Sequence, residues 1–222
     1  MKHVLSDLYQ TRTDSPLPGL TTHAYLWTGR NALFYSTATD DDFAALAELG
    51  GVTHQYLSHR DEAGPMLAKI ADHFGSTLHA PVAELLDIGQ HAHVDVPLGS
   101  RHVDVNGVEV IPTPGHSPGS TCYLVDGADG SYLFTGDTLI QGAAGNWWAG
   151  YIAGISDADA LATSLRLLRT LNPDIVISSA FQGDSAVHRI QAGRWQDHVD
   201  EALDGLAAGL ATLRTGTRNA CP

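Results

Sequence analysis

TPGHSPGS, residues 113–120, is the most specific string in this 222-residue sequence. Hydrophobic residues on either side predict one strand that ends at Ile111 and another that begins at Thr121. The Pro-Gly pairs between them predict a rigid turn, so the imidazole of His116 is held in place before any ligand arrives. Such a histidine can bind a metal ion at little entropic cost. The alternative is a histidine that only forms a structural hydrogen bond in the turn.

A second motif, Phe134-Thr135-Gly136-Asp137, places a carboxylate at the end of another predicted strand. A glycine-rich loop with Trp147 and Trp148 comes next. These tryptophans either line a pocket or pack in the core. Because both motifs lie at strand ends, we expect the side chains of His116 and Asp137 to converge on one site.

Together the two motifs resemble those of the metallo-β-lactamase fold hydrolases. In that family a TPGHTPGS-like turn supplies a metal-binding histidine, and an FTGD-like strand end supplies an aspartate that bridges two metals. The resemblance covers roughly residues 4–190 in the right order. It implies an α/β fold, an αββα sandwich with its site at the sheet edges near His59, His116 and Asp137. No linker divides the sequence, so we expect one domain over residues 1–222 with a frayed tail from about residue 215.

Hydrophobic periodicity predicts alternating groups of strands and helices. Helices are expected over residues 43–49, 66–74, 81–86, 157–171 and 192–213. Strands are expected over residues 4–11, 22–27, 32–35, 52–58, 77–79, 94–96, 103–105, 108–111, 121–125, 132–134 and 174–178. This order suits two sheets packed face to face with helices outside.

The family's first ligand motif, HxHxDH after an apolar strand, is altered here to Ser58-His59-Arg60-Asp61-Glu62-Ala63-Gly64. Two registers fit this run. In the one that we prefer, because residues 52–57 then fill the preceding strand, His59 is the first ligand and Asp61 replaces the second histidine. Ala63 and Gly64 then stand at the places of the aspartate and the last histidine.

In the other register His59 is the second histidine, Asp61 is the aspartate and Glu62 replaces the last histidine. A structural interpretation is also open, in which Arg60 neutralises both acids in an ion-paired loop. The run His91-Ala92-His93-Val94-Asp95 is closer to HxHxD on paper. It precedes an alternating strand rather than following one, so we expect its side chains to face solvent.

Two further family motifs are changed. Residues 175–183 lack the Gly-His pair that gives the final ligand, and the early Asp-Thr-Gly is replaced by Ser36-Thr37-Ala38. In the preferred register the resemblance therefore implies the metal ligands His59, Asp61, His116 and Asp137. The second metal site has then lost every ligand except Asp137. We expect at most one divalent metal ion, Zn²⁺, Fe²⁺ or Mn²⁺, or none.

This ligand set implies a metal-dependent hydrolase with a degenerate, at most mononuclear site and a small ester, thioester, lactone or phosphate-type substrate. Asp61 or Glu62 would act as the base, with Asp137 as a further catalytic carboxylate. One alternative is a mononuclear iron oxygenase on the same triad, because persulfide dioxygenases of this superfamily hold iron with the matching residues. The other is a catalytically silent protein that keeps the fold for a binding role.

Charge and hydropathy exclude other classes of protein. The 25 acidic and 12 basic residues give a net charge of −13, which repels nucleic acid. No apolar stretch approaches the roughly 20 residues of a membrane helix, and no signal-peptide core follows the first residues. We therefore expect a cytoplasmic protein that binds a small-molecule substrate and neither nucleic acid nor membrane. The sequence does not predict the oligomeric state.

Overall fold

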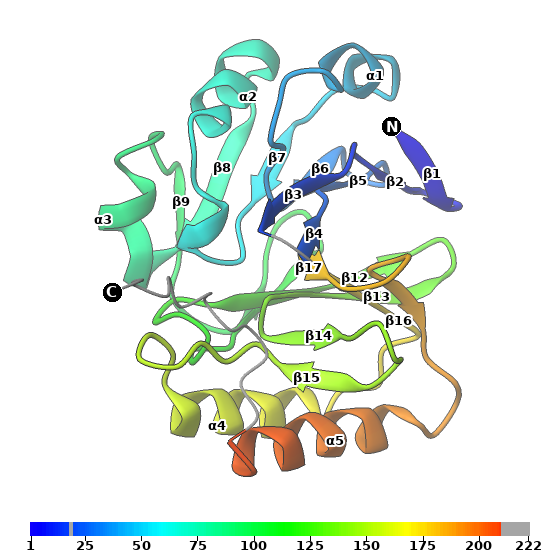
Figure 1. Cartoon of the computed structure of the whole chain (residues 1–222). Coiled ribbons are helices and arrows are strands. Elements are labelled where there is room, and N and C mark those ends of the chain that lie inside the picture. Colours follow the sequence, from blue (N-terminus) through cyan, green and yellow to red (C-terminus); the bar gives the residue numbers. More distant parts are fainter. Residues whose placement is uncertain (18–19, 210–222) are drawn as a thin grey trace, which may run out of the picture.

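The computed structural model of the chain describes residues 1–17 and 20–209 (Figure 1). Two β-sheets pack face to face, and helices cover the outer side of each (Figure 1). The first sheet has the strand order β1-β2-β5-β6-β7-β8-β9, and the second has the order β10-β11-β12-β13-β16-β18. The αββα sandwich predicted from the sequence is confirmed. The end of the predicted helix 192–213 and the predicted frayed tail lie outside the described residues.

The strands and helices have the following bounds. The first sheet contains β1 (Lys2–Leu5), β2 (Leu8–Gln10), β5 (Tyr25–Trp27), β6 (Ala32–Phe34), β7 (His54–Tyr56), β8 (Thr77–Pro81) and β9 (Val96–Leu98). The second contains β10 (His102–Val103), β11 (Glu109–Pro112), β12 (Thr121–Gly127), β13 (Gly130–Gly136), β16 (Ile175–Ser178) and β18 (Val187–Arg189). Smaller pairings join β14 (Leu139–Gln141) with β15 (Trp147–Ala149), and β17 (Ala180–Phe181) with β4 (Leu20–Thr22) and β3 (Asp14–Leu17). The helices are α1 (Phe43–Glu48), α2 (Met66–Phe74), α3 (Leu85–Ile88), α4 (Ala158–Leu168) and α5 (Trp195–Ala207), with short 3₁₀ turns at Arg60–Glu62 and Val82–Glu84.

Helices α2 and α4 show how local sequence sets the element ends. The predicted bounds of α2 are confirmed, and Gly75 ends it with a left-handed backbone (φ 66°) that glycine adopts without strain. At the start of α4, the Asp157 carboxylate accepts a hydrogen bond from the backbone N–H of Ala160 (2.9 Å). These two ends are fixed by single residues that the sequence already displays.

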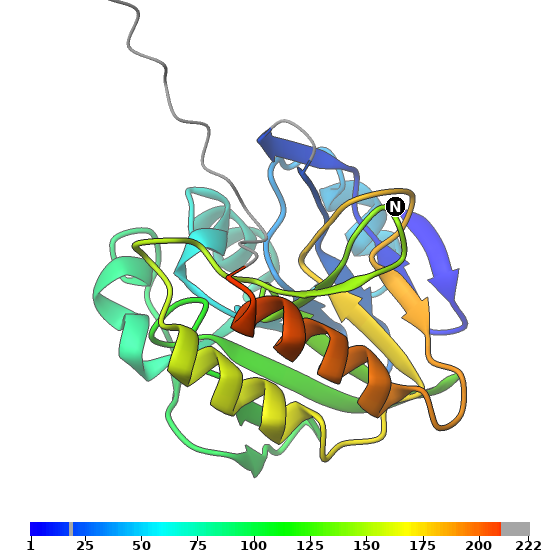
Figure 2. The same ribbon diagram turned by 60° about the horizontal axis from the view of Figure 1, so that its bottom comes forward.

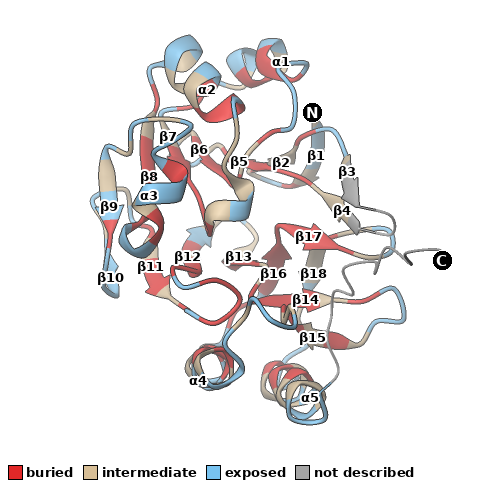
Figure 3. Cartoon of the chain, turned by 60° about the vertical axis from the view of Figure 1, so that its left-hand side comes forward, coloured by how far each residue is buried: buried red, intermediate tan, exposed pale blue. Residues whose placement is uncertain are grey.

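Side chains that alternate along β13 belong to two hydrophobic clusters, one between the two sheets and one between the second sheet and its helices. Tyr132 and Phe134 point between the sheets, where Phe34 stacks on Phe134 at a ring distance of 3.8 Å. Leu133 points the other way and packs under α4 and α5, which lie side by side across the second sheet (Figure 2). The buried strands therefore form a middle layer between helices whose outward faces are exposed (Figure 3). Both faces of β13 are buried at its centre, where the hydrophobic residues Tyr132, Leu133 and Phe134 follow one another.

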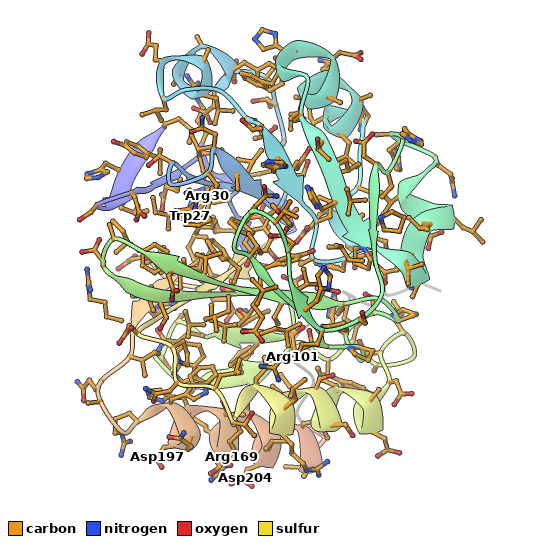
Figure 4. The ribbon with its side chains drawn as sticks, turned by 180° about the vertical axis from the view of Figure 1, so that it is seen from behind. Trp27, Arg30, Arg101, Arg169, Asp197 and Asp204 are labelled. Carbon is orange, nitrogen blue, oxygen red and sulfur yellow. The ribbon has the colours of Figure 1, made fainter. Side chains whose placement is uncertain are left out.

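The outer surface is largely polar. On α5, Asp197 and Asp204 are exposed on the side away from the sheet, and Arg169 lies beside them at the end of α4 (Figure 4). Among the described helices, none combines the length and the apolar character that a membrane span requires. The predicted cytoplasmic location and the single domain remain predictions.

Several predicted elements are wrong in detail. The strand expected over residues 4–11 is a hairpin, because Ser6 and Asp7 form a tight turn between β1 and β2. The segment 81–86 starts as a 3₁₀ turn, and the strand expected at 94–96 lies at 96–98. The β14–β15 hairpin was not predicted. The sequence around it is rich in glycine, which has a low strand propensity, and the two short strands are defined by their pairing with each other.

Candidate metal centre

The strand ends at one edge of the sandwich carry the predicted site residues. His59 follows β7, His116 lies in the turn between β11 and β12, and Asp137 directly follows β13. Strands β13 and β16 run parallel, so the residue after β16, Ser179, lies next to Asp137. The structure therefore brings together side chains that are far apart in the sequence.

The turn that carries His116 is anchored on α4. The backbone N–H of Asp157 donates to the carbonyl oxygen of Gly115 (2.8 Å), and the Ser164 hydroxyl donates to that of Pro114 (2.7 Å). Gly115 has φ 140°, and a Cβ there would lie 2.3 Å from the backbone of Leu161, so only glycine fits. The contact with α4 holds the histidine without help from its imidazole.

The orientation of the His116 ring is set by its Nδ1 atom. Nδ1 lies 2.7 Å from the carbonyl oxygen of Gly150, in the unpredicted loop after β15. A carbonyl oxygen can only accept, so Nδ1 carries the hydrogen and Nε2 is left to bind a cation. Gly150 permits this approach, because a Cβ at that position would lie 1.6 Å from the carbonyl oxygen of Asp137.

The His59 ring is oriented in the same way by a side chain. Its Nδ1 lies 2.8 Å from the Ser58 hydroxyl, which itself donates to Glu62 Oε1 (2.5 Å). Because the single hydroxyl hydrogen is used on Glu62, the Ser58 oxygen accepts from Nδ1–H. His59 Nε2 therefore also faces the site.

The polar atoms of the predicted ligands converge on one small volume. His59 Nε2 lies 3.6 Å from Asp137 Oδ2 and 3.9 Å from Asp61 Oδ2. His116 Nε2 lies 3.6 Å from Asp61 Oδ2 and 3.8 Å from Asp137 Oδ2. The ligand atoms of His59, Asp61 and His116 all lie within 4.8 Å of one another. One cation between the two imidazoles would contact a carboxylate on either side.

Two observations test whether these residues fit a metal ion. The Nε2 atoms of His59 and His116 are buried and have no hydrogen-bond partner among the described residues. Buried polar atoms normally have such a partner, and two imidazoles with carboxylates form a donor set that suits Zn²⁺, Fe²⁺ or Mn²⁺. The residues present therefore fit a divalent ion.

The charges around the site favour a cation. Burial lowers the pKa of His59, but the hydrogen-bonded carboxylate of Glu62 and the charges of Asp137 and Asp61 outweigh it and raise the pKa to about 10. The neighbouring His116 ring, opposed by burial and helped by the charge of His59, holds the pKa of Asp61 below its ordinary value. A proton or a metal ion bound at Nε2 would be stabilised by the same negative charge of the surrounding carboxylates.

The predicted candidates differ in how far they reach the site. The Asp61 side chain is 57% exposed, whereas that of Glu62 is 8% exposed and turned back toward Ser58. Arg60 does not neutralise these acids, since its guanidinium pairs with Asp87 (3.1 Å). Asp61 therefore lies beside the Nε2 atoms of His59 and His116, whereas Glu62 lies beside Nδ1 of His59.

The run at residues 91–95 takes no part in the site. His91 and His93 are exposed, and the Asp95 carboxylate accepts a hydrogen bond from the backbone N–H of Leu78 (2.8 Å).

Trp147 is buried in the hydrophobic core, where it packs against α5. Of the two roles considered for this tryptophan, the structure supports packing in the core.

A pocket of about 330 Å³ opens on the predicted ligands. Its wall includes Arg12, Thr22 and His23 from the N-terminal part of the chain, Thr37 from the loop after β6, and Ser179. Sequence reasoning missed these wall residues and the roles of Ser58 and Gly150. Ser179 was visible in the sequence only as the residue that stands where the family's final histidine is expected.

Comparisons with known proteins show which sequences and folds the chain resembles. One relative, the hydroxyacylglutathione hydrolase of Neisseria gonorrhoeae, is 32% identical over 108 residues, which are 48% of this chain and 40% of that protein. The hydroxyacylglutathione hydrolase of Shewanella oneidensis is 31% identical over 125 residues, 54% of this chain and 43% of that protein. The matches thus span less than half of these relatives' length.

Solved structures share the fold at low sequence identity. A metallo-beta-lactamase from Pontibacter korlensis superposes with a TM-score of 0.65 at 14% identity, over 93% of this chain and 97% of that one. The DIM-1 metallo-beta-lactamase gives a TM-score of 0.70 at 16% identity, over 94% and 96% of the two chains. Residues 43–180, more than half of the chain, match the metallo-beta-lactamase superfamily as a sequence family. The chain belongs to the metallo-beta-lactamase superfamily.

Proposed function

We propose that this protein is a metal-dependent hydrolase that cleaves small acyl thioesters at a site holding one divalent ion. The observation that carries the proposal is a pair of buried Nε2 atoms, those of His59 and His116, which have no hydrogen-bond partner among the described residues. Asp61 and Asp137 lie beside them in the lining of a pocket. When bound, a divalent ion at this position polarises a carbonyl group and acidifies water.

The choice of a thioester rests on the relatives and on the pocket. The curated relatives are named for hydrolysis of hydroxyacylglutathione, a thioester. A pocket of about 330 Å³ suits a small acyl group with part of its thiol. Esters, lactones and phosphate-type substrates are the alternatives that a substrate panel separates.

The choice of one ion rests on missing donors. In the preferred register Ala63 and Gly64 offer no side-chain donor for a second ion. The hydroxyl of Ser179 donates a hydrogen bond to Asp137 Oδ1, which occupies the oxygen that would bridge to a second metal. These three positions support a mononuclear site, with Zn²⁺, Fe²⁺ or Mn²⁺ as the ion.

The carboxylates take different roles in this proposal. Asp61 lines the pocket and its side chain is 57% exposed, whereas that of Asp137 is 12% exposed, so we assign Asp61 as the base that accepts a proton. Asp137 is held by Ser179 and orients the site from the other side. Both oxygens of Glu62 accept hydrogen bonds from Ser58, so we do not assign it the role of base.

Metal content and thioester hydrolysis test the proposal together. Purified protein is analysed for metals and assayed with S-lactoylglutathione, in the parent and in His116→Ala, with His54→Gln as a control outside the site. We expect about one ion per chain and turnover in the parent and the control, and neither in His116→Ala. Stoichiometric iron with oxygen consumption on a persulfide would favour the oxygenase instead. Absence of both metal and turnover would favour the catalytically silent protein.

A further inference from the structure

Glu62 is a buried carboxylate that accepts two hydrogen bonds from Ser58 and also lies against the His59 ring. Its Oε2 accepts from the backbone N–H of Ser58 (2.8 Å), and its Oε1 accepts from the Ser58 hydroxyl (2.5 Å). Oε1 also lies 3.4 Å from Nδ1 of His59. The carboxylate therefore lies on the Nδ1 side of the imidazole, while Nε2 faces Asp61 and Asp137.

The hydrogen bonds run in one direction. The Ser58 hydroxyl hydrogen points to Glu62, so the Ser58 oxygen accepts the hydrogen of His59 Nδ1. Gly136 leaves room for this hydroxyl, because a Cβ there would lie 2.3 Å from Ser58 Oγ. The contact is thus built from both sheets, with Ser58 following β7 and Gly136 ending β13.

Glu84, at the end of the 3₁₀ turn after β8, shows what a purely structural acid beside the same loop does. It is 1% exposed, and its carboxylate accepts from the backbone N–H groups of Arg60 (2.6 Å) and Gly119 (3.0 Å). It thereby ties the His59 loop to the His116 turn, and within the described part of the chain it forms no hydrogen bond to a histidine. Glu62, in contrast, is directed at the hydrogen-bonding atom of His59.

We propose that Glu62, acting through the Ser58 hydroxyl, is a positioning residue that fixes the His59 ring with Nε2 toward Asp61 and Asp137 and makes it a stronger donor to a metal ion. A carboxylate behind a metal-binding histidine fixes ring orientation and raises ligand basicity. The inference rests on the proposed metal site. It gives a role in that site to Glu62, which is not one of the proposed metal ligands.

Measurement of Zn²⁺ affinity distinguishes a positioning role of Glu62 from a general effect on the stability of the loop. It is measured by competition with a chromophoric chelator for the parent, Glu62→Gln, Ser58→Ala and the double variant, with Glu84→Gln as the matched control. We expect each single variant to bind Zn²⁺ about 10- to 100-fold more weakly, and the double variant to lose little more, because both act in one chain of hydrogen bonds. Glu84→Gln should lower the melting temperature and weaken Zn²⁺ binding less than Glu62→Gln or Ser58→Ala does, because Glu84 contacts neither imidazole.

A second readout needs no metal. In nitrogen-15 spectra of the metal-free parent, His59 Nδ1–H should give an exchange-protected, downfield proton signal that Ser58→Ala and Glu62→Gln change and Glu84→Gln does not. If this signal is present but the parent binds no Zn²⁺, the positioning role stands and the proposed metal-dependent function fails. The positioning role is overturned if the signal is the same in all variants, or if Glu62→Gln binds Zn²⁺ as the parent or Glu84→Gln does.

Discussion

Ser179 donates its hydroxyl hydrogen to Oδ1 of Asp137, while Oδ2 of the same carboxylate faces His59 Nε2 at 3.6 Å and His116 Nε2 at 3.8 Å. The two oxygens of one aspartate are thus assigned to different partners. The hydroxyl comes from the end of β16, where relatives of this fold are expected to supply a histidine. This exchange of a metal ligand for a hydrogen-bond donor underlies our expectation of a mononuclear site.

Removal of that hydroxyl should weaken metal binding without changing its stoichiometry. In Ser179→Ala the Asp137 carboxylate is free to rotate, so we expect affinity for Zn²⁺ or Mn²⁺ to fall by about tenfold. Isothermal titration of the parent and the variant gives both the affinity and the number of sites. Two tight equivalents in the parent would show that ligands have been missed.

Loss of the turn histidine should abolish metal binding and leave the fold intact. In His116→Ala the turn keeps its contacts through Gly115 and Pro114 to α4, which do not involve the imidazole. Circular dichroism should match that of the parent while metal no longer binds in a titration. Unchanged metal stoichiometry in this variant would remove the whole site proposal.

A single substitution at Asp61 tests the register of the altered motif. In the preferred register this residue replaces a histidine, so Asp61→His should raise the affinity for Zn²⁺ relative to Mn²⁺, because imidazole suits Zn²⁺ better than a carboxylate does. In the other register Asp61 already holds the family's aspartate position, and the same change should weaken binding of both ions. A variant indistinguishable from the parent would make Asp61 a loop residue without a role in binding.

Buried histidines away from the site should make stability depend on pH. Burial, with a smaller contribution from the charge of His54, lowers the pKa of His79 to about 4, and burial lowers that of His188 to about 4. Between roughly pH 6.5 and pH 4 the unfolded chain binds protons at these residues and the folded chain does not, so stability falls as the pH is lowered through this window.

Chemical denaturation of metal-free protein measures this dependence. The unfolding free energy of the parent should decrease from pH 7 to pH 5, and that of His79→Gln should decrease less steeply. His91→Gln, at an exposed histidine, should follow the parent. If the unfolding free energy of the parent and that of His79→Gln fall equally steeply with pH, the pKa of His79 is not lowered in the folded protein.

The local parts of this structure could be predicted from sequence, and the contacts that complete the site could not. Helix α2 and the His116 turn are specified by apolar spacing and by Pro and Gly residues within a few positions. The carbonyl oxygen of Gly150 meets His116 only because the β14–β15 hairpin folds back over the turn. Ser179 reaches Asp137 because two parallel strands end together. No short sequence pattern encodes these long-range contacts.

The central claim, one ion between two buried imidazoles, is tested most directly by anomalous diffraction. Crystals grown with Zn²⁺ are measured on both sides of the zinc absorption edge. We predict one strong anomalous peak per chain, located between Nε2 of His59 and Nε2 of His116 and within bonding distance of both. A map with no peak there, or with two peaks of comparable strength around Asp137, would contradict the account.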